Sequence, residues 1–167
     1  MIKKIFKNKS AGFVILYAVI ISSMVLAIAL GVLDIAYKEI KFSTSARDTN
    51  DAFFAADTGL ECALFNDKST GDSFVEVGFS GEIVCRGGAI TLNGSFPEWD
   101  FIISQLGSVG ESCARVNVKK DTATYAPDTA TTITSSGYNN GGGNPGECDS
   151  APGTVIRELQ AFDLRHE

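Results

Sequence analysis

The feature that most constrains this chain is an uncharged apolar run of 23 residues near its N-terminus, Ala11 to Leu33. An α-helix rises about 1.5 Å per residue, so this run reaches roughly 35 Å and can cross a hydrocarbon core of about 30 Å. The residues before it include no acidic residue and four lysines: Lys3, Lys4, Lys7 and Lys9. By the positive-inside rule this end stays in the cytoplasm, and everything after Asp34 is expected outside.

Composition excludes several classes of protein. A chain of 167 residues with a net charge of -6 is expected to be one domain with an appendage, without the basic footprint of a nucleic-acid binder. The single His, and four Cys without CxxC spacing, argue against a metal site and for disulfides in an oxidising compartment. Motifs of nucleophilic or zinc-dependent catalysis are absent, so we expect no enzyme and no cofactor.

Three interpretations of the N-terminus remain open. A secretory signal peptide would use Ala27-Ile28-Ala29 as its cleavage site, although the apolar run is long for one and continues to Leu33. A plain single-pass anchor for an outer domain that binds a ligand or partner fits the hydropathy. The third interpretation explains the join between the basic leader and the apolar run, Lys9-Ser10-Ala11-Gly12-Phe13.

This join resembles the type IV pilin and type II secretion pseudopilin superfamily. In that family a membrane peptidase cuts after a Gly and the new N-terminal residue is N-methylated. The resemblance implies cleavage between Gly12 and Phe13, with N-methylation of Phe13. The family's usual Glu at the fifth mature position is Tyr17 here, which indicates a minor pilin of the PilX type, or a pseudopilin at a filament tip, rather than a bulk subunit.

A second stretch supports the same family. Asn50 to Leu64 reads NDAFFAADTGLECAL and resembles the A-F-x-A-A-E-x-G-L-x-x-A-L stretch of PilX-type proteins, with Asp57 in place of Glu. The resemblance covers about the first 65 residues and the remainder only by architecture. It implies a filament subunit of the inner membrane and then of a pilus or pseudopilus, whose partners are other pilins, the prepilin peptidase and the assembly platform. No nucleic acid is expected as a partner.

The first part of the chain is predicted to be one long helix. Proline is absent before Pro97, so residues 13–33 can continue from the membrane into an amphipathic helix over residues 34–67. Asn66, Asp67 and Gly71 are expected to end it. Two rows at seven-residue spacing form the stripe expected to pack on a core: Ile35, Phe42, Thr49, Ala56 and Ala63, beside Glu39, Ala46, Phe53 and Leu60.

Residues 68–167 are predicted to form a small antiparallel sheet against the helix, because β-branched runs alternate with Gly-containing turns. The fold class is therefore α+β, the layout of pilin heads. Trp99 is expected in packing. Six runs are expected as strands: residues 73–79, 82–85, 89–92, 113–118, 130–136 and 154–159.

Four cysteines allow three pairings, of which we favour Cys62 with Cys85 and Cys113 with Cys148. The loop from Gly137 to Gly146 lacks the Gly-Lys-Ser/Thr ending of a P-loop and is expected to be a surface loop. Two further patterns are weaker. Glu147 and Asp149 leave calcium binding open, without EF-hand spacing, and Asn93-Gly94-Ser95 is a glycosylation sequon by pattern alone.

Overall fold

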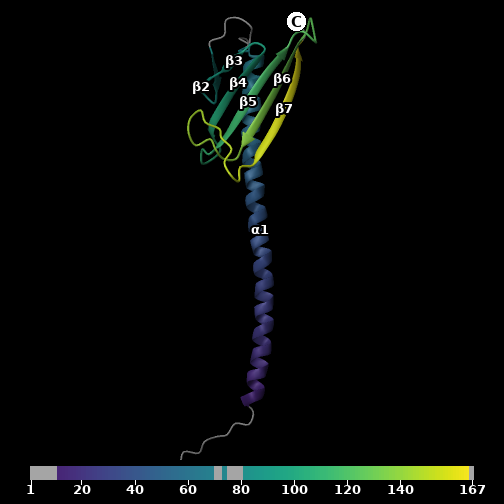
Figure 1. Ribbon diagram of the computed structural model, residues 1–167, viewed down its shortest axis with the longest axis vertical. Coiled ribbons are helices and arrows are strands. Elements are labelled where there is room, and N and C mark those ends of the chain that lie inside the picture. Colours follow the sequence, from purple (N-terminus) through teal and green to yellow (C-terminus); the bar gives the residue numbers. More distant parts are fainter. Residues whose placement is uncertain (1–10, 70–72, 75–80, 166–167) are drawn as a thin grey trace, which may run out of the picture. The chain divides into compact units, whose positions relative to one another are not determined.

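The computed structural model describes residues 11–69, 73–74 and 81–165 (Figure 1). The chain divides between Thr44 and Ser45 into two compact units. The first holds the apolar part of the only helix in the described ranges, and the second, here called the head, holds the rest of that helix and all described strands. The predicted leader, residues 1–12, lies outside the described residues except for Ala11 and Gly12.

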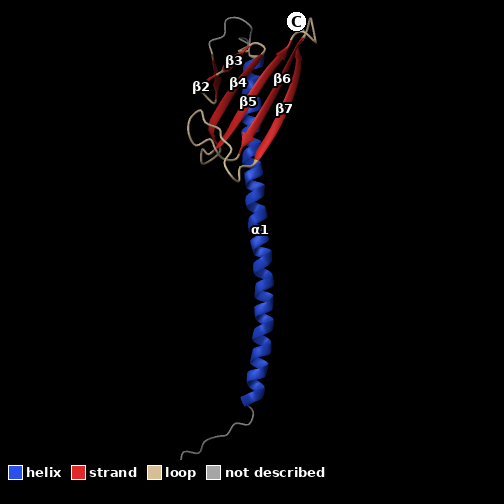
Figure 2. Cartoon of the chain, in the orientation of Figure 1, coloured by secondary structure: helices blue, strands red, loops and turns tan. Residues whose placement is uncertain are grey.

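The helix α1 runs without interruption from Ala11 to Lys68, which confirms the prediction of one continuous helix (Figure 2). Its residues form a helix because the stretch lacks proline and its few glycines are isolated. Every side chain described from Phe13 to Thr44 is exposed. In the head the helix becomes buried on one side, beginning with Ala52.

The strands of the head form one hairpin and one antiparallel sheet. The hairpin pairs β1 (Glu82–Cys85) with β2 (Gly88–Thr91). The five-stranded sheet follows chain order, β3-β4-β5-β6-β7, and every neighbouring pair in it is antiparallel. Its strands are β3 (Asn93–Ser95), β4 (Glu98–Leu106), β5 (Ser112–Asp121), β6 (Thr129–Tyr138) and β7 (Ile156–Arg165). This is the predicted α+β fold.

Predicted and observed strands differ in places. The runs at residues 82–85, 89–92, 113–118, 130–136 and 154–159 correspond to β1, β2, β5, β6 and β7. Strands β3 and β4 were not predicted, although β4 carries Trp99, which is buried as expected. The predicted strand at 73–79 lies outside the described residues except for Ser73 and Phe74.

The core lies between the sheet and the last turns of α1. Strands β4, β5 and β6 alternate buried and exposed residues, as expected for a sheet with one face covered. The ring of Trp99 meets Phe74 and Phe96 edge-on, with centroids 5.6 and 6.1 Å apart. The helix contributes mostly small residues to this core: Ala52, Ala55, Ala56, Gly59 and Ala63.

Small side chains bring the helix unusually close to β5 and β6. A Cβ on Gly59 would lie 2.7 Å from Val116 Cγ2, and a Cβ on Gly137 would overlap the backbone of Ala52 and Ala56. At the same contact the buried Ser135 hydroxyl donates a hydrogen bond of 2.7 Å to the Ala56 carbonyl. Helix and sheet backbones are therefore in direct contact here.

The predicted stripe is wrong in its first half. Ile35, Phe42, Ala46 and Phe53 are exposed, whereas Ala56 and Ala63 are buried as expected. The buried face instead follows a spacing of three and four residues through Ala52 and Ala55. That is the spacing of a straight helix packed along one side.

Candidate functional site: the exposed helix and the disulfide-closed head

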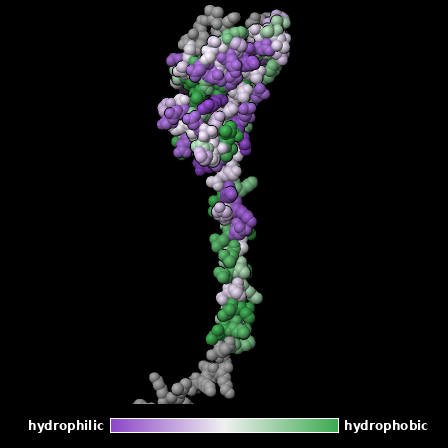
Figure 3. Space-filling model, in the orientation of Figure 1, coloured by the Kyte–Doolittle hydropathy of each residue, from purple (hydrophilic) through white to green (hydrophobic). Residues whose placement is uncertain are grey.

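The apolar part of α1 has no covering layer in the described chain. Residues from Phe13 on contain a stretch long and apolar enough to cross a membrane, and none of that stretch is buried (Figure 3). Large side chains point outward all round it, including Phe13, Ile20 and Leu30. Water is a poor solvent for so much apolar surface, so this helix needs a lipid or protein environment.

One side of this helix carries a shallow groove. Its lining is almost entirely apolar, and small residues lower its floor, notably Ala18 and Ser22. The Ser22 hydroxyl donates to the Val19 carbonyl at 3.0 Å, so it is satisfied within its own helix. The groove is lined by Val14, Tyr17, Ala18, Ile21, Ser22, Val25, Leu26 and Ala29.

The predicted processing residues stand at the start of α1. The helix begins at Ala11, so the Gly12–Phe13 bond falls in its first turn. The side chain of Phe13 is 76% exposed. Tyr17 follows four residues later and is also exposed, so both rings are open to a neighbour on the same face.

The four predicted cysteines form two disulfides, in the pairing that the sequence favours. Cys62 on α1 is bonded to Cys85 at the end of β1, with Cα atoms 5.7 Å apart. Cys113 on β5 is bonded to Cys148 beyond the glycine-rich loop, with Cα atoms 5.6 Å apart. One disulfide therefore fastens the hairpin to the helix, and the other fastens the loop to the sheet.

A buried ion cluster at the end of α1 was not predicted. The sequence predicts for Asp67 only that it helps to end the helix, but its side chain is 0% exposed. Its carboxylate lies 2.8 Å from the Arg165 guanidinium and 3.2 Å from Lys120 Nζ, and Arg165 also donates to the Asp67 carbonyl. The missed signal is an acidic residue in the last helical turn, where the helix dipole disfavours an anion unless cations are near.

The predicted surface loop from Gly137 to Gly146 is wrong at its start, because Gly137 and Tyr138 belong to β6 and Gly137 is buried against α1. The remainder, the glycine-rich loop, is held by hydrogen bonds to the sheet. The Gln105 N–H donates to the Gly142 carbonyl at 2.9 Å, and the Gly142 N–H donates to the Glu111 carbonyl at 2.8 Å. Both carboxylates considered for calcium accept from protein donors: Glu147 from Asn144 at 2.6 Å, and Asp149 from Arg115 at 3.1 Å. Groups of three or more His, Cys, Asp or Glu suited to a metal do not occur among the residues that the structure describes.

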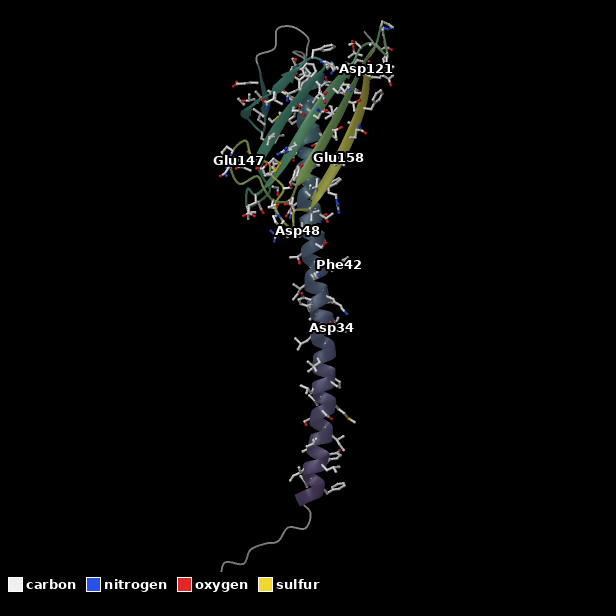
Figure 4. The ribbon with its side chains drawn as sticks, viewed as in Figure 1. Asp34, Phe42, Asp48, Asp121, Glu147 and Glu158 are labelled. Carbon is white, nitrogen blue, oxygen red and sulfur yellow. A yellow bond between two sulfur atoms is a disulfide. The ribbon has the colours of Figure 1, made fainter. Side chains whose placement is uncertain are left out.

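On the outer face of the sheet, neighbouring strands β4 and β5 carry polar side chains, and Figure 4 labels two further acidic residues of the head, Asp121 at the end of β5 and Glu158 on β7. Asn117 donates to Glu98 at 2.8 Å and to Asp100 at 2.9 Å, so these carboxylates share one amide. At the turn after β5, the Thr124 backbone N–H is the main cause that lowers the pKa of Asp121 below its ordinary 3.8, helped by the Thr124 side chain and the Ala123 N–H. Asn93 and Ser95 of the sequon are both exposed on β3.

The structure therefore does not bring the predicted residues together in one site: Gly12 and Phe13 lie at the start of α1, and the two disulfides fasten different elements of the head. The sequence matches no family model, and the searches of curated proteins and of solved structures found no match to it.

Proposed function

We propose that this chain is a structural subunit, a minor pilin or pseudopilin, of a type IV pilus-like filament. In this proposal the prepilin peptidase cuts between Gly12 and Phe13, Phe13 is N-methylated, and the mature chain assembles through its apolar helix. The observation that carries the proposal is that one uninterrupted helix is first fully exposed and apolar and then becomes part of the packed core of the head.

This continuity favours a filament subunit over a tethered domain. A tethered domain usually follows a Gly-, Ser- or Pro-rich spacer, whereas here Asp34 to Lys68 remain helical up to the sheet. Helix–helix packing in a lipid-free filament core could replace the lipid contacts of residues 13–33. The groove at Ala18 and Ser22 suits such packing, because small residues four apart let two helices approach closely.

The outer side of α1 within the head offers a second contact surface. Phe54 and Phe65 are 62% and 70% exposed, on the side of the helix away from the sheet. Phe65 and Val84 line a groove of about 460 Å³. Other pilins are the partners expected there, and the prepilin peptidase, assembly platform and inner membrane act earlier on the leader and apolar helix.

The disulfides agree with a head outside the cytoplasm, where thiols become oxidised. The protein is expected first in the inner membrane and then in a surface pilus or periplasmic pseudopilus. Tyr17 in place of the family's Glu removes the carboxylate that pairs with a neighbour's terminal amine. A position at the tip or as a minor component follows from that loss.

The test is the intact mass and N-terminal sequence of the full chain, expressed with and without a prepilin peptidase. The proposal expects a chain that begins at Phe13 and is one methyl group heavier than its sequence, only when the peptidase is present. Gly12→Val should block this cut, and Gly31→Val, within the same helix and in open space, is the matched control. An uncut chain would favour the single-pass anchor, and a chain beginning at Leu30 a secreted domain.

A further inference from the structure

The two edges of the head's sheet are built differently. One edge is β3, three residues long, and the other is β7, ten residues long. In the described part of the chain β7 has a strand neighbour on one side only, where all ten residues pair with β6 from Ile156↔Tyr138 to Arg165↔Thr129. A long edge of this kind is a template for another strand.

Strand β7 has one face partly covered by α1 and the other face exposed. Leu159, Ala161, Asp163 and Arg165 are half-buried toward the α1 side, and the residues between them are exposed. Apolar side chains stand on the exposed side: Ile156 at 44%, Phe162 at 58% and Leu164 at 39%. Tyr125 covers part of Phe162, with ring centroids 5.9 Å apart.

The sequence of β7 is complementary to itself in one antiparallel register. If Gln160 faces Gln160 of a second copy, Arg157 stands opposite Asp163 at both ends of the pair, and Ile156 stands opposite Leu164. Residues directly opposite each other must share a face, so the register can move only in steps that keep odd residues opposite odd ones. The next register in one direction places Arg157 opposite Arg165, and in the other Arg157 faces Ala161.

We propose that β7 is a self-association edge, which pairs with β7 of a second copy of this chain around a two-fold axis through Gln160. The two five-stranded sheets then form one continuous sheet. The charged neighbours of Arg157 and Asp163 within one chain are compatible with this pairing. Arg157 contacts Thr49 at 3.4 Å, and Asp163 faces Lys68 at 3.3 Å and Arg165 at 3.9 Å, so the second copy adds an opposite charge to each.

The pairing also fixes the direction of the two chains. Within the head, α1 runs parallel to β7, because Thr49 lies at Arg157 and Asp67 lies at Arg165. Antiparallel β7 strands therefore bring together two head helices that run in opposite directions. The two chains enter the pair from opposite ends, as chains carried by two facing membranes or filaments would. This inference does not depend on the proposed filament function.

Cross-linking of the full chain in detergent tests the register. Gln160→Cys should give an intermolecular disulfide under mild oxidation, and the matched control is Ser95→Cys, an exposed position on the opposite edge. Association through the apolar helix alone would cross-link both variants equally, and that result would overturn the proposal. A melting temperature equal to that of the unmodified protein confirms that each variant is folded.

Charge exchange between two chains is the sharper test. Arg157→Asp places two acidic pairs at the interface and should weaken the self-pair about tenfold or more. Asp163→Arg places two basic pairs there. Mixing the two variants restores both complementary pairs, so hetero-pairs should exceed either self-pair, as measured by cross-linking of differently tagged chains that also carry Gln160→Cys. A mixture that pairs no better than its components would refute the register.

The direction of the chains is tested with vesicles of neutral phospholipid that carry the full chain with its head outside. Vesicles with the unmodified protein should aggregate, and those with Arg157→Asp should remain dispersed, as followed by turbidity. Cross-links at Gln160→Cys that form only within single vesicles would show that the pairing joins neighbours in one membrane, against the proposal.

Discussion

At the residue scale, the head depends on glycines at positions where only a hydrogen atom fits, and Gly137 is one of them. A Cβ on Gly137 would overlap the backbone of Ala52 and Ala56, which cannot move without displacing α1. We expect Gly137→Ala to lower the free energy of unfolding by about 3 kcal/mol, the upper range for overpacking. Gly143→Ala, which meets nothing within 4 Å, should change it by less than about 0.5 kcal/mol. Chemical denaturation of the purified full chain measures both, and equal stability of the two variants would contradict the close contact.

Asp121 makes a small, pH-dependent contribution at the same scale. Hydrogen bonds from Thr124 and Ala123 hold its pKa below the ordinary 3.8, so its ionised form stabilises the fold above that pH. The contribution is lost as the pH falls through the lowered pKa. We therefore expect the stability difference between the unmodified protein and Asp121→Asn to shrink below about pH 4. Denaturation at a series of pH values measures it, and a constant difference would exclude this role.

At the scale of elements, the end of α1 is joined to β5 and β7 by the buried Asp67. Removing one partner of a buried ion pair leaves the others poorly compensated and costs about 3 to 5 kcal/mol. Asp67→Asn should destabilise the head by this amount, since Lys120 and Arg165 lose the anion between them. Asp149→Asn breaks an ion pair with Arg115 that is open to solvent and should cost less than about 1 kcal/mol. Thermal unfolding measures the loss of stability in each variant. Similar losses for Asp67→Asn and Asp149→Asn would mean that the buried ion pairs of Asp67 do not stabilise the head more than an exposed pair does.

The two disulfides close loops of 23 and 35 residues. In the chain-entropy model each adds about 3 to 4 kcal/mol, mainly by restricting the unfolded chain. Replacing Cys62 and Cys85 together by Ser, or Cys113 and Cys148 together, should each lower stability by about this amount. Chemical denaturation with and without reductant measures the free energy of unfolding of each variant. The control is a chain that lacks all four cysteines, whose free energy of unfolding should not change when reductant is added.

The sequence predicted the elements whose signals are local. The continuous helix followed from the apolar run and the absence of proline, and β5 and β6 followed from their β-branched alternation. The first half of the predicted stripe failed because the sheet covers α1 only within the head: every described side chain from Phe13 to Thr44 is exposed, whichever side of the helix it occupies, so Ile35 and Phe42 have no core to pack on. The Asp67 cluster was missed because its partner Arg165 is 98 residues away in the sequence.

At the scale of the whole molecule, two units with opposite solvent requirements share one helix. The thirteen Phe, Val, Ile and Leu residues within 13–33 favour membrane insertion by roughly 4 to 8 kcal/mol, and one central Asp costs about 2.5 to 3.5. Val19→Asp combined with Val25→Asp should therefore abolish most insertion. The matched control is Ile40→Asp combined with Phe42→Asp, which are exposed beyond the predicted membrane segment. Resistance to alkaline carbonate extraction measures insertion. Loss of this resistance in both double variants would show that the membrane segment is not confined to residues 13–33.

The contact between Asp67 and Arg165 joins parts of the head that are far apart in the sequence, which bears on when the head can fold. The carboxylate that becomes buried at the end of α1 receives its guanidinium from the last described strand, at a sequence separation of 98 residues. A head that closes only with its final strand stays unfolded while the earlier residues emerge from the ribosome. A translocon accepts unfolded chain, so late closure of the head would favour the export that the proposed function requires.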